Sequence, residues 1–308
     1  MKVIFMGTPD FAVPTLELLE KEHEVSLVIT QPDRPKGRGK QMTPPPVKAK
    51  ALELGIEVYQ PESINTEESI SKIKEISPDI IVVVAYGQVL NEEILNLPKY
   101  KCVNVHASLL PKYRGAAPLN WVIINGEEKS GITIMEMNKG LDTGDMISKR
   151  EIAIDDDMTA GELHDELMHV GAELLIDTLK DIENGTATKE VQDDSMSSYA
   201  HMMDKSLGKI DWNKSALDIK NLVRGTQPWP GAYFEYENKI VKVFETDICD
   251  EMKETENGKV VKVNEEGIFV SVKDGYIILK KIQVPGKRSM TIEEFLRGNE
   301  FKTDVILR

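Results

Sequence analysis

Short apolar runs alternate with stretches of helical pattern through the first half of the chain. The runs are rich in β-branched residues, and the run IIVVV (80–84) has no polar residues at alternate positions, as expected of a strand that helices cover on both faces. Residues 11–20, between the first two runs, have the apolar spacing of a helix. We therefore expect βαβ units around a parallel sheet, with strands at residues 3–5, 25–29, 80–84 and 102–105.

A longer helix is predicted over residues 159–183. Thr159 and Glu162 have the spacing of a capping box, and apolar side chains follow at helical spacing. The pair Asn184-Gly185 supplies a helix stop. Residues 189–208 are then polar and poorly periodic, so we expect a linker between two domains there.

Beyond this linker the pattern changes to short strands separated by turn residues. Helices are expected over residues 215–224 and from Thr291 onward, and the strands predicted between them are 233–246, 258–264, 268–272 and 276–284. The fold class is therefore α/β. We expect a Rossmann-like, doubly wound, mostly parallel sheet in a first domain, residues 1–188, followed by a small OB-like antiparallel β-barrel, residues 209–308.

The composition excludes several classes of protein. No apolar run approaches the ~18 residues of a membrane-spanning helix. Residues 1–7 lead directly into a strand without the features of a signal peptide, so we expect a cytoplasmic protein without membrane association. Cys102 and Cys249 are the two cysteines, and they provide neither a disulfide framework nor the spacing of metal ligands.

Acidic and basic residues are unevenly distributed along the chain. A net charge of −14 opposes binding to a polyanion, because phosphate contacts depend on Lys and Arg. Residues 207–308 contain equal numbers of acidic and basic residues, so the acidic excess lies in residues 1–206. Within that acidic part, residues 31–50 carry six basic residues and the single acid Asp33. This segment is a candidate contact for an anionic partner.

The strongest candidate for chemistry is the segment from Asn104 to Pro111. It directly follows an apolar strand, and ligands of open α/β sheets bind at the carboxyl ends of the strands. Alternation along the strand places Asn104 and His106 on one face. A later glycine-rich loop contains Asp142. A carboxamide, an imidazole and a carboxylate together suit acyl transfer, because they can stabilise an oxyanion, move a proton and orient the imidazole.

Motifs along essentially the whole chain carry a resemblance to a known family. They are MGTPDF (6–11), QPDRP (31–35), GRGK (37–40), NVHASLLP (104–111), YRGAAP (113–118), GLDTGD (140–145), IDW (210–212) and PWP (228–230). With these motifs the sequence resembles the methionyl-tRNA formyltransferases, within the family of 10-formyltetrahydrofolate-dependent formyltransferases. The Asn-x-His and SLLP motifs mark the wider family, and the basic loop and the second domain narrow the resemblance to enzymes that act on tRNA.

The resemblance implies a reaction and roles for three residues. The formyl group of 10-formyltetrahydrofolate would pass to the α-amine of methionine on initiator Met-tRNA, for translation initiation. Asn104 would donate its amide to the formyl oxygen, His106 would be a second donor or a proton carrier, and Asp142 would hold His106 or an ordered water. No metal is expected, because the formyl carbon is already activated on a folate nitrogen.

The resemblance also implies two binding surfaces. The folate pocket would be formed by Ser108, Leu109, Leu110 and Pro111 together with Tyr86, Gly87, Gln88, Val89 and Leu90. The acceptor stem of the tRNA would contact Arg34, Lys36, Arg38 and Lys40 of the basic loop, and Lys205 and Lys209 near the linker. The barrel would provide further RNA contacts, and the protein is expected to be a monomer.

Two other functions stay open. A sugar-nucleotide N-formyltransferase shares the Asn-x-His core and a barrel-like second domain, but its small substrate has no use for the basic loop. An RNA-binding module with an inert Rossmann-like half would leave Asn104, His106 and Asp142 without a purpose. Taken singly, His106 also fits a structural hydrogen-bonding role, Asp142 a turn residue and the basic loop a solvated connection.

Overall fold

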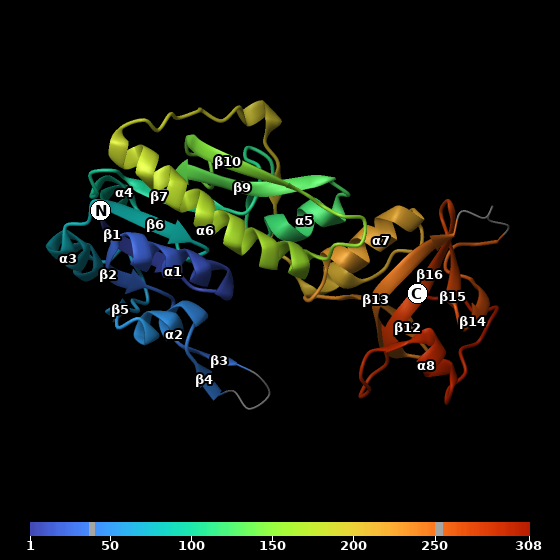
Figure 1. Ribbon diagram of the computed structural model, residues 1–308. Helices are drawn as coiled ribbons and strands as arrows, with labels where there is room; N and C mark the ends of the chain where they lie inside the picture. The colour runs from blue at the N-terminus through green and yellow to red at the C-terminus, as the bar shows by residue number, and fades with distance from the viewer. Residues whose placement is uncertain (37–40, 250–254) are drawn as a thin grey trace. The chain divides into compact units, whose positions relative to one another are not determined.

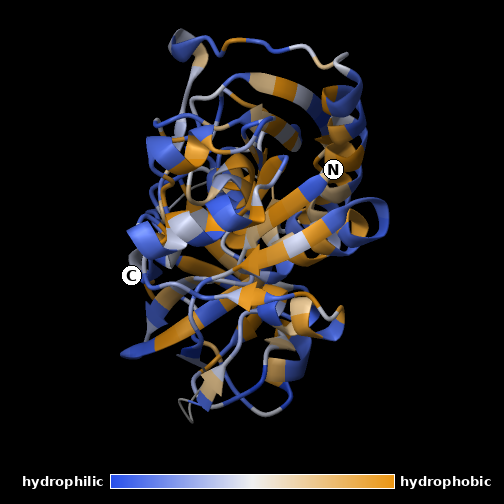
Figure 2. Ribbon diagram, turned by 90° about the vertical axis from the view of Figure 1, so that its left-hand side faces the viewer, coloured by the Kyte–Doolittle hydropathy of each residue, from blue (hydrophilic) through white to orange (hydrophobic). Residues whose placement is uncertain are grey.

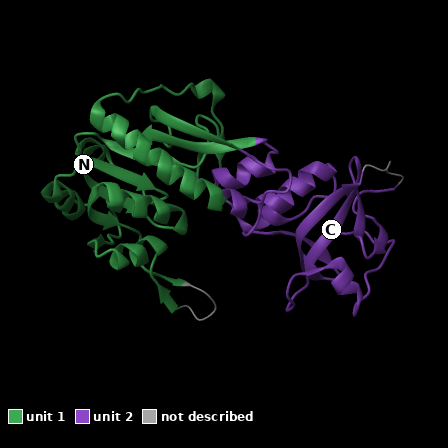
Figure 3. Ribbon diagram, in the orientation of Figure 1, with its two compact units in different colours: residues 1–115, 129–152, 164–200 green, residues 116–128, 153–163, 201–308 purple. Residues whose placement is uncertain are grey.

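The computed structural model describes residues 1–36, 41–249 and 255–308 (Figure 1). The chain forms two compact units, each assembled from three segments (Figure 3). Unit 1 comprises residues 1–115, 129–152 and 164–200, and unit 2 comprises residues 116–128, 153–163 and 201–308. The domain limits expected from the sequence, 1–188 and 209–308 with a linker at 189–208, stay a prediction.

A seven-stranded sheet forms the centre of unit 1. Its strand order is β10-β9-β7-β6-β1-β2-β5; the five strands from β7 to β5 are parallel, and β9 runs antiparallel to β7. This confirms the predicted doubly wound, mostly parallel sheet. The strands are β1 (Lys2–Gly7), β2 (Glu24–Ile29), β5 (Val58–Tyr59), β6 (Ile80–Val84), β7 (Cys102–His106), β9 (Lys129–Glu136) and β10 (Met146–Ala153).

Helices lie between the strands, and their ends follow local capping rules. Thr66 and Asn91 each accept a hydrogen bond from a backbone N–H of the first turn that they cap. The predicted capping box of Thr159 and Glu162 is present at the start of the longest helix. The helices are α1 (Val13–Glu22, after the 3₁₀ turn η1, Asp10–Ala12), α2 (Pro46–Glu53), α3 (Glu67–Ile76), α4 (Glu92–Asn96) and α6 (Ala160–Asn184).

Successive residues of β7 face opposite sides of the sheet. Cys102 belongs to an apolar cluster that includes side chains of α4. Val105 faces α6, which approaches so closely that a Cβ at Gly171 would lie 2.9 Å from the Val105 Cγ1. Because side chains alternate along a strand, Asn104 and His106 share the face of Cys102. Figure 2 shows hydrophobic residues along the strands, whereas most connecting loops are hydrophilic.

The polar segment after α6 is attached to unit 1 by backbone pairing. It contains the 3₁₀ turn η2 (Asp194–Met196) and β11 (Tyr199–Ala200), which pairs in parallel with β8 (Arg114–Gly115). An isolated bridge also joins Glu190 to Met146 of β10, and the segment follows this side of the sheet in Figure 1. The sequence predicts no strand here, because pairing with β8 rather than a local apolar pattern creates it.

Unit 2 contains a curved antiparallel sheet. Its order is β12-β13-β16-β15-β14, and β17 pairs with β16. The C-terminal residues join the two edge strands, since Val260 N donates to Val305 O and Glu235 N donates to Arg308 O. This confirms the predicted small barrel. Its elements are β12 (Ala232–Tyr236), β13 (Lys239–Cys249), β14 (Val260–Asn264), β15 (Gly267–Val272), β16 (Gly275–Gln283), β17 (Met290–Thr291) and α8 (Ile292–Leu296).

The stretch 233–246 is a hairpin, although the sequence predicts one strand. Glu237 and Asn238 form the turn between β12 and β13, with φ of 48° and 59°. A two-residue turn with both residues left-handed matches the twist of antiparallel strands. The turn was missed because it contains no glycine and its flanks are continuously β-forming.

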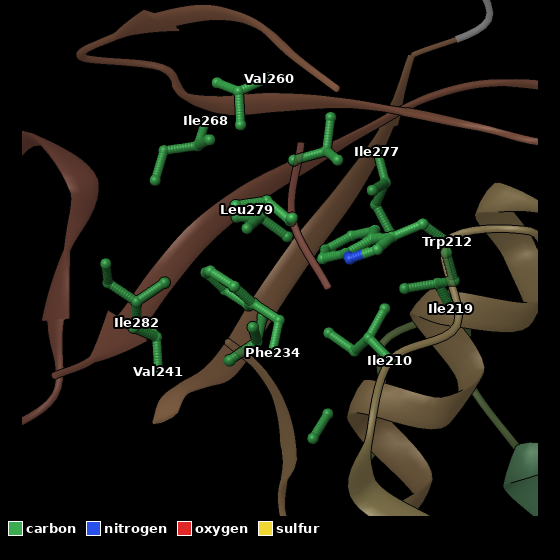
Figure 4. Close-up of a cluster of buried hydrophobic side chains, with 14 of the residues drawn as sticks. Ile210, Trp212, Ile219, Phe234, Val241, Val260, Ile268, Ile277, Leu279 and Ile282 are labelled. Carbon is green, nitrogen blue, oxygen red and sulfur yellow. The ribbon is translucent and has the colours of Figure 1, made fainter. Parts of the chain in front are cut away.

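The core of unit 2 lies between this sheet and the helix α7 (Ala216–Gly225) (Figure 4). Trp212 packs edge-on against Phe234 with ring centroids 5.7 Å apart. The unit also contains α5 (Pro118–Ile124) and the 3₁₀ turn η3 (Lys205–Gly208).

In the parts of both units that the structure describes, no helix is long and apolar enough to cross a bilayer.

Candidate active site

The last residues of β7 carry the predicted carboxamide and imidazole. Asn104 lies between Val83 of β6 and Met135 of β9, and His106 lies opposite Thr133 of β9. The Asn104 side chain is half-buried, and His106 is only 5% exposed. The backbone of Asn104 is therefore held by strands on both sides and that of His106 by β9, at the carboxyl end of the parallel sheet where ligands bind in this architecture.

The structure brings Asp142 to His106. Asp142 Oδ2 lies 3.2 Å from His106 Nε2, which is an ion-pair distance, but Nε2 makes no hydrogen bond of acceptable geometry. The same carboxylate oxygen accepts a hydrogen bond of 2.8 Å from the backbone N–H of Gly115. Asp142 itself has a left-handed backbone with φ of 52°. Of the predicted catalytic residues, His106 and Asp142 thus form a close pair.

The surroundings of Asp142 favour its ionised form. Burial opposes ionisation, but contact with His106, the Gly115 N–H and the positive charge of Arg114 together lower the pKa of Asp142 below its ordinary value. Asp142 is therefore a carboxylate at neutral pH. It can stabilise a positive charge on His106.

This lowered pKa predicts a pH dependence of stability. Because the folded-state pKa lies below the unfolded one, ionised Asp142 stabilises the fold above the unfolded pKa, and this contribution is lost as pH falls through the folded pKa. We expect the free energy of unfolding of wild type, measured with urea, to fall towards that of Asp142→Asn as the pH is lowered below about 5. Curves that stay parallel would contradict the assignment.

Ser108 determines which nitrogen of His106 carries the proton. The Ser108 hydroxyl donates to the carbonyl of Lys112 at 2.8 Å and lies 3.0 Å from His106 Nδ1. Since its one proton is already used, the hydroxyl must accept a hydrogen bond from Nδ1–H. The other ring nitrogen, Nε2, lies next to the Asp142 carboxylate. Nε2 and Asp142 together form an acceptor for one proton.

The turn after His106 is held by the buried Thr133. Its hydroxyl donates to Ser108 O at 2.7 Å and accepts from the N–H of Leu110 at 3.1 Å. Leu110 is buried, whereas Leu109 and Pro111 are half-buried. The turn is thus rigid, and it presents Leu109 and Pro111 rather than the Ser108 hydroxyl.

The second predicted folate segment, residues 86–90, follows β6 directly. Tyr86 and Leu90 belong to the same apolar cluster as Cys102. Burial raises the pKa of Tyr86 to about 12. The half-buried Gln88 accepts from Ile64 N at 2.9 Å. Gly87 and Val89 are exposed. Exposed surface in this segment therefore comes mainly from backbone and from Val89.

The predicted tRNA contacts fall into three groups. Arg34 is exposed on β3 (Arg34–Lys36), which pairs with β4 (Gln41–Thr43). Lys36 ends β3, and Arg38 and Lys40 lie outside the described residues. In unit 2, Lys205 is exposed in η3, and Lys209 Nζ lies 3.4 Å from a Glu235 carboxylate.

Two further basic residues of the segment 31–50 are already paired. Lys48 forms an ion pair with Asp33 at 2.8 Å. Lys50 pairs with Glu17 and Glu53, each at 2.9 Å. These two charges are therefore neutralised within unit 1, whereas the Arg34 side chain is exposed.

Two residues next to Asp142 were missed from the sequence. Arg114 is only 2% exposed, and its guanidinium contacts the side chains of Gln192 and Asp194. Gln192 in turn donates to the backbone of the Asp142 loop. Arg114 lies within a recognised motif that gave it no role. Nothing local to Gln192 distinguishes it from its polar neighbours.

The fold and the site define an α/β enzyme of acyl transfer. A carboxamide lies at the carboxyl edge of the sheet beside an imidazole–carboxylate pair, which is the set needed to stabilise an oxyanion and remove a proton. Among residues 1–36, 41–249 and 255–308, no three His, Cys, Asp or Glu side chains gather in a way that could hold a metal ion.

Comparison with known proteins gives the family. The formyl transferase model matches residues 1–179, and the model of the formyl transferase C-terminal domain matches residues 202–300. The chain belongs to the formyl transferase family. It is 53% identical to the methionyl-tRNA formyltransferase of Clostridioides difficile, with all of both chains covered. It is 52% identical to that of Clostridium novyi, again with complete coverage of both.

Solved structures share the fold at lower identity. An N-formyltransferase from Helicobacter canadensis, in complex with folinic acid and dTDP-3-aminofucose, has a TM-score of 0.69 and 24% identity and covers 91% of this chain and 98% of its own. The sugar 3N-formyl transferase WlaRD, solved with dTDP and 5-N-formyl-THF, has a TM-score of 0.70 and 22% identity, covering 94% and 99%. At this identity the likeness establishes the fold alone.

Proposed function

We propose that this protein transfers the formyl group of 10-formyltetrahydrofolate to the α-amine of methionine on initiator Met-tRNA. One observation carries the proposal: relatives named methionyl-tRNA formyltransferase are 52–53% identical over the complete length of both chains. The geometry supports it, because Asn104, His106 and Asp142 lie where ligands bind in this architecture.

Each of the three residues has a distinct part in the reaction. The amine attacks the formyl carbon, and the Asn104 amide donates to the formyl oxygen as it becomes an oxyanion. The His106–Asp142 pair, of which the Asp142 carboxylate is the more exposed member, accepts the proton that the amine loses. The bond from the formyl carbon to N10 of the folate then breaks, and N10 takes up a proton. Products are the formylated amine and tetrahydrofolate.

Folate would bind between the segment 86–90 and the turn 108–111. Val89 and Leu109 would form apolar walls, and backbone groups of the exposed loop would meet the hydrogen-bonding edge of the pterin. Ser108 would act on His106 rather than on folate, because its hydroxyl is already engaged on both sides.

The tRNA would contact the β3–β4 hairpin, where Arg34 is exposed and the nearby Lys48 and Lys50 are paired within unit 1. In unit 2 the exposed Lys205 would add a phosphate contact, and Lys209 would do so by exchanging its partner Glu235 for a phosphate. Each phosphate contact releases counterions, so binding weakens with salt. The acidic remainder of the protein makes this dependence modest.

We expect Arg34→Ala to raise KM for Met-tRNA several-fold and to reduce the salt slope of tRNA binding by about 1. The KM for 10-formyltetrahydrofolate should not change. Lys50→Ala is the matched control, because it removes a cation of the same segment that two carboxylates already neutralise. Equal effects of the two variants on tRNA binding would argue against a phosphate contact at Arg34.

The acceptor distinguishes this proposal from a sugar-nucleotide N-formyltransferase. Purified protein with 10-formyltetrahydrofolate is offered initiator Met-tRNA or a dTDP-linked amino sugar, and kcat/KM is measured for each. We expect formylation of Met-tRNA and negligible formylation of the sugar. The reverse preference would replace the proposed function by formylation of a sugar nucleotide.

A further inference from the structure

We infer that Gln192, fixed by Arg114, is a positioning residue that holds Asp142 against His106. This inference rests on the proposed function. Gln192 belongs to the polar segment after α6, far from the catalytic loop in sequence, and all the contacts involved lie within unit 1.

The Gln192 amide uses its full hydrogen-bonding capacity. Its oxygen accepts from Arg114 Nε at 3.0 Å and from Nη2 at 2.8 Å. Its nitrogen donates to the carbonyl oxygens of Asp142 and Gly144, both at 2.8 Å. Four bonds in these directions fix the side chain and leave no alternative orientation of the amide. Gln192 is 7% exposed, so water cannot easily replace them.

Arg114 holds the Gln192 oxygen in place. Its guanidinium is almost completely buried, and the Nη2 atom also donates to the exposed Asp194 at 2.8 Å. Its backbone N–H donates to Ser198 O at 2.8 Å, within the pairing of β8 with β11. The charge of Arg114 also contributes to the ionisation of Asp142.

The loop that carries Asp142 and Gly144 needs this support because its conformation is unusual. Asp142 has a left-handed backbone, and Gly144 is so close to Glu136 that a Cβ would lie 1.7 Å from its carbonyl oxygen. Gln192 binds the carbonyls on both sides of Thr143. The loop is thereby pinned at the residue that carries the carboxylate.

The same polar segment also positions the donor to the carboxylate. Gly115 N donates to Asp142 Oδ2, and Gly115 is paired with Ala200 of β11. A Cβ at Gly115 would lie 2.9 Å from Ala200 O, so the two backbones are in close contact. The segment after α6 therefore holds Asp142 at its backbone through Gln192 and at its side chain through Gly115.

The test is Gln192→Glu, which separates the contact of residue 192 with Arg114 from its contacts with the loop that carries Asp142. A carboxylate keeps the pairing with Arg114, but it replaces the two N–H donors by an oxygen that faces two carbonyls. We expect kcat to fall about 10- to 100-fold, since a small displacement of a catalytic group has effects of this size. The KM for each substrate should stay within about 2-fold of wild type, because neither substrate binds Gln192.

Asp194→Asn is the matched control. It removes the negative charge of the exposed partner of Arg114 and leaves Gln192 intact, so kcat should equal that of wild type. Gln192→Asn, which keeps the amide on a shorter side chain, provides a second variant if Gln192→Glu does not fold. It should lower kcat in the same direction. Wild-type kcat in a folded Gln192 variant, or an equal loss in Asp194→Asn, would overturn the inference.

A spectroscopic measurement separates this inference from the proposed function. The imidazole ¹⁵N resonances of His106 report its contact with Asp142 and do not require turnover. They should move in Gln192→Glu towards those of Asp142→Asn and stay unchanged in Asp194→Asn. Unmoved resonances in Gln192→Glu would overturn the positioning role, whereas wild type that formylates no Met-tRNA would overturn the proposed function alone.

Discussion

Asn104→Ala is expected to lower kcat for formyl transfer by about 10²–10³-fold, the usual effect of removing one oxyanion donor. The strand partners on both sides of Asn104 fix its backbone, so the substitution removes the carboxamide without moving the strand. KM for 10-formyltetrahydrofolate should change little, because the donor acts mainly when charge develops on the formyl oxygen. Single-turnover kinetics at saturating substrates measure this directly.

The control is Asn96→Ala, which removes an exposed carboxamide from the end of α4. Its kcat should be that of wild type. A folded Asn104→Ala protein with wild-type turnover would reject Asn104 as an oxyanion donor, and an increase confined to KM would place its role in substrate binding.

His106→Ala is expected to lower kcat by about 10²–10⁴-fold, the range for loss of a positioned proton acceptor. His106→Gln is the more informative substitution, because an amide can still donate to Ser108 but cannot take up a proton. Its rate should be similarly low. His164→Ala, which removes a partly exposed histidine paired with Asp165, is the control and should be active.

Coupling between His106 and Asp142 follows from their 3.2 Å contact. If they act as one proton acceptor, the double substitution His106→Ala and Asp142→Asn should cost little more than His106→Ala alone. Additive losses would show that each residue acts independently of the other.

The centre of the sheet in unit 1 was predictable because strands such as β1 and β6 are buried on both faces. A continuous apolar run such as Ile80–Val84 has no other common explanation when helical patterns flank it. The same reasoning failed where the backbone conformation depends on contacts with other parts of the chain. The stretch 233–246 reads as one strand, but Glu237 and Asn238 turn the chain without glycine, and β11 exists only because β8 lies beside it.

Some residues of the site were likewise predictable from the sequence, and others were not. Asn104 and His106 were predictable from strand alternation and their place at a strand end, and the glycines around Asp142 marked its loop. Gln192 was not predictable, because its importance comes from four hydrogen bonds to residues distant in sequence. Ser108 is assigned to folate from the motif, and that assignment stays a prediction; its hydroxyl contacts His106.

The central claim is that the carboxamide of Asn104 and the His106–Asp142 pair act together on a formyl group that moves to Met-tRNA. The most direct measurement is a single turnover with 10-formyltetrahydrofolate that carries a radiolabelled formyl group, in wild type and in the Asn104→Ala and Asp142→Asn variants. The account predicts rapid appearance of label on the methionine amine with wild type and a large loss of rate in both variants. Label that reaches Met-tRNA at the wild-type rate in both folded variants would contradict it.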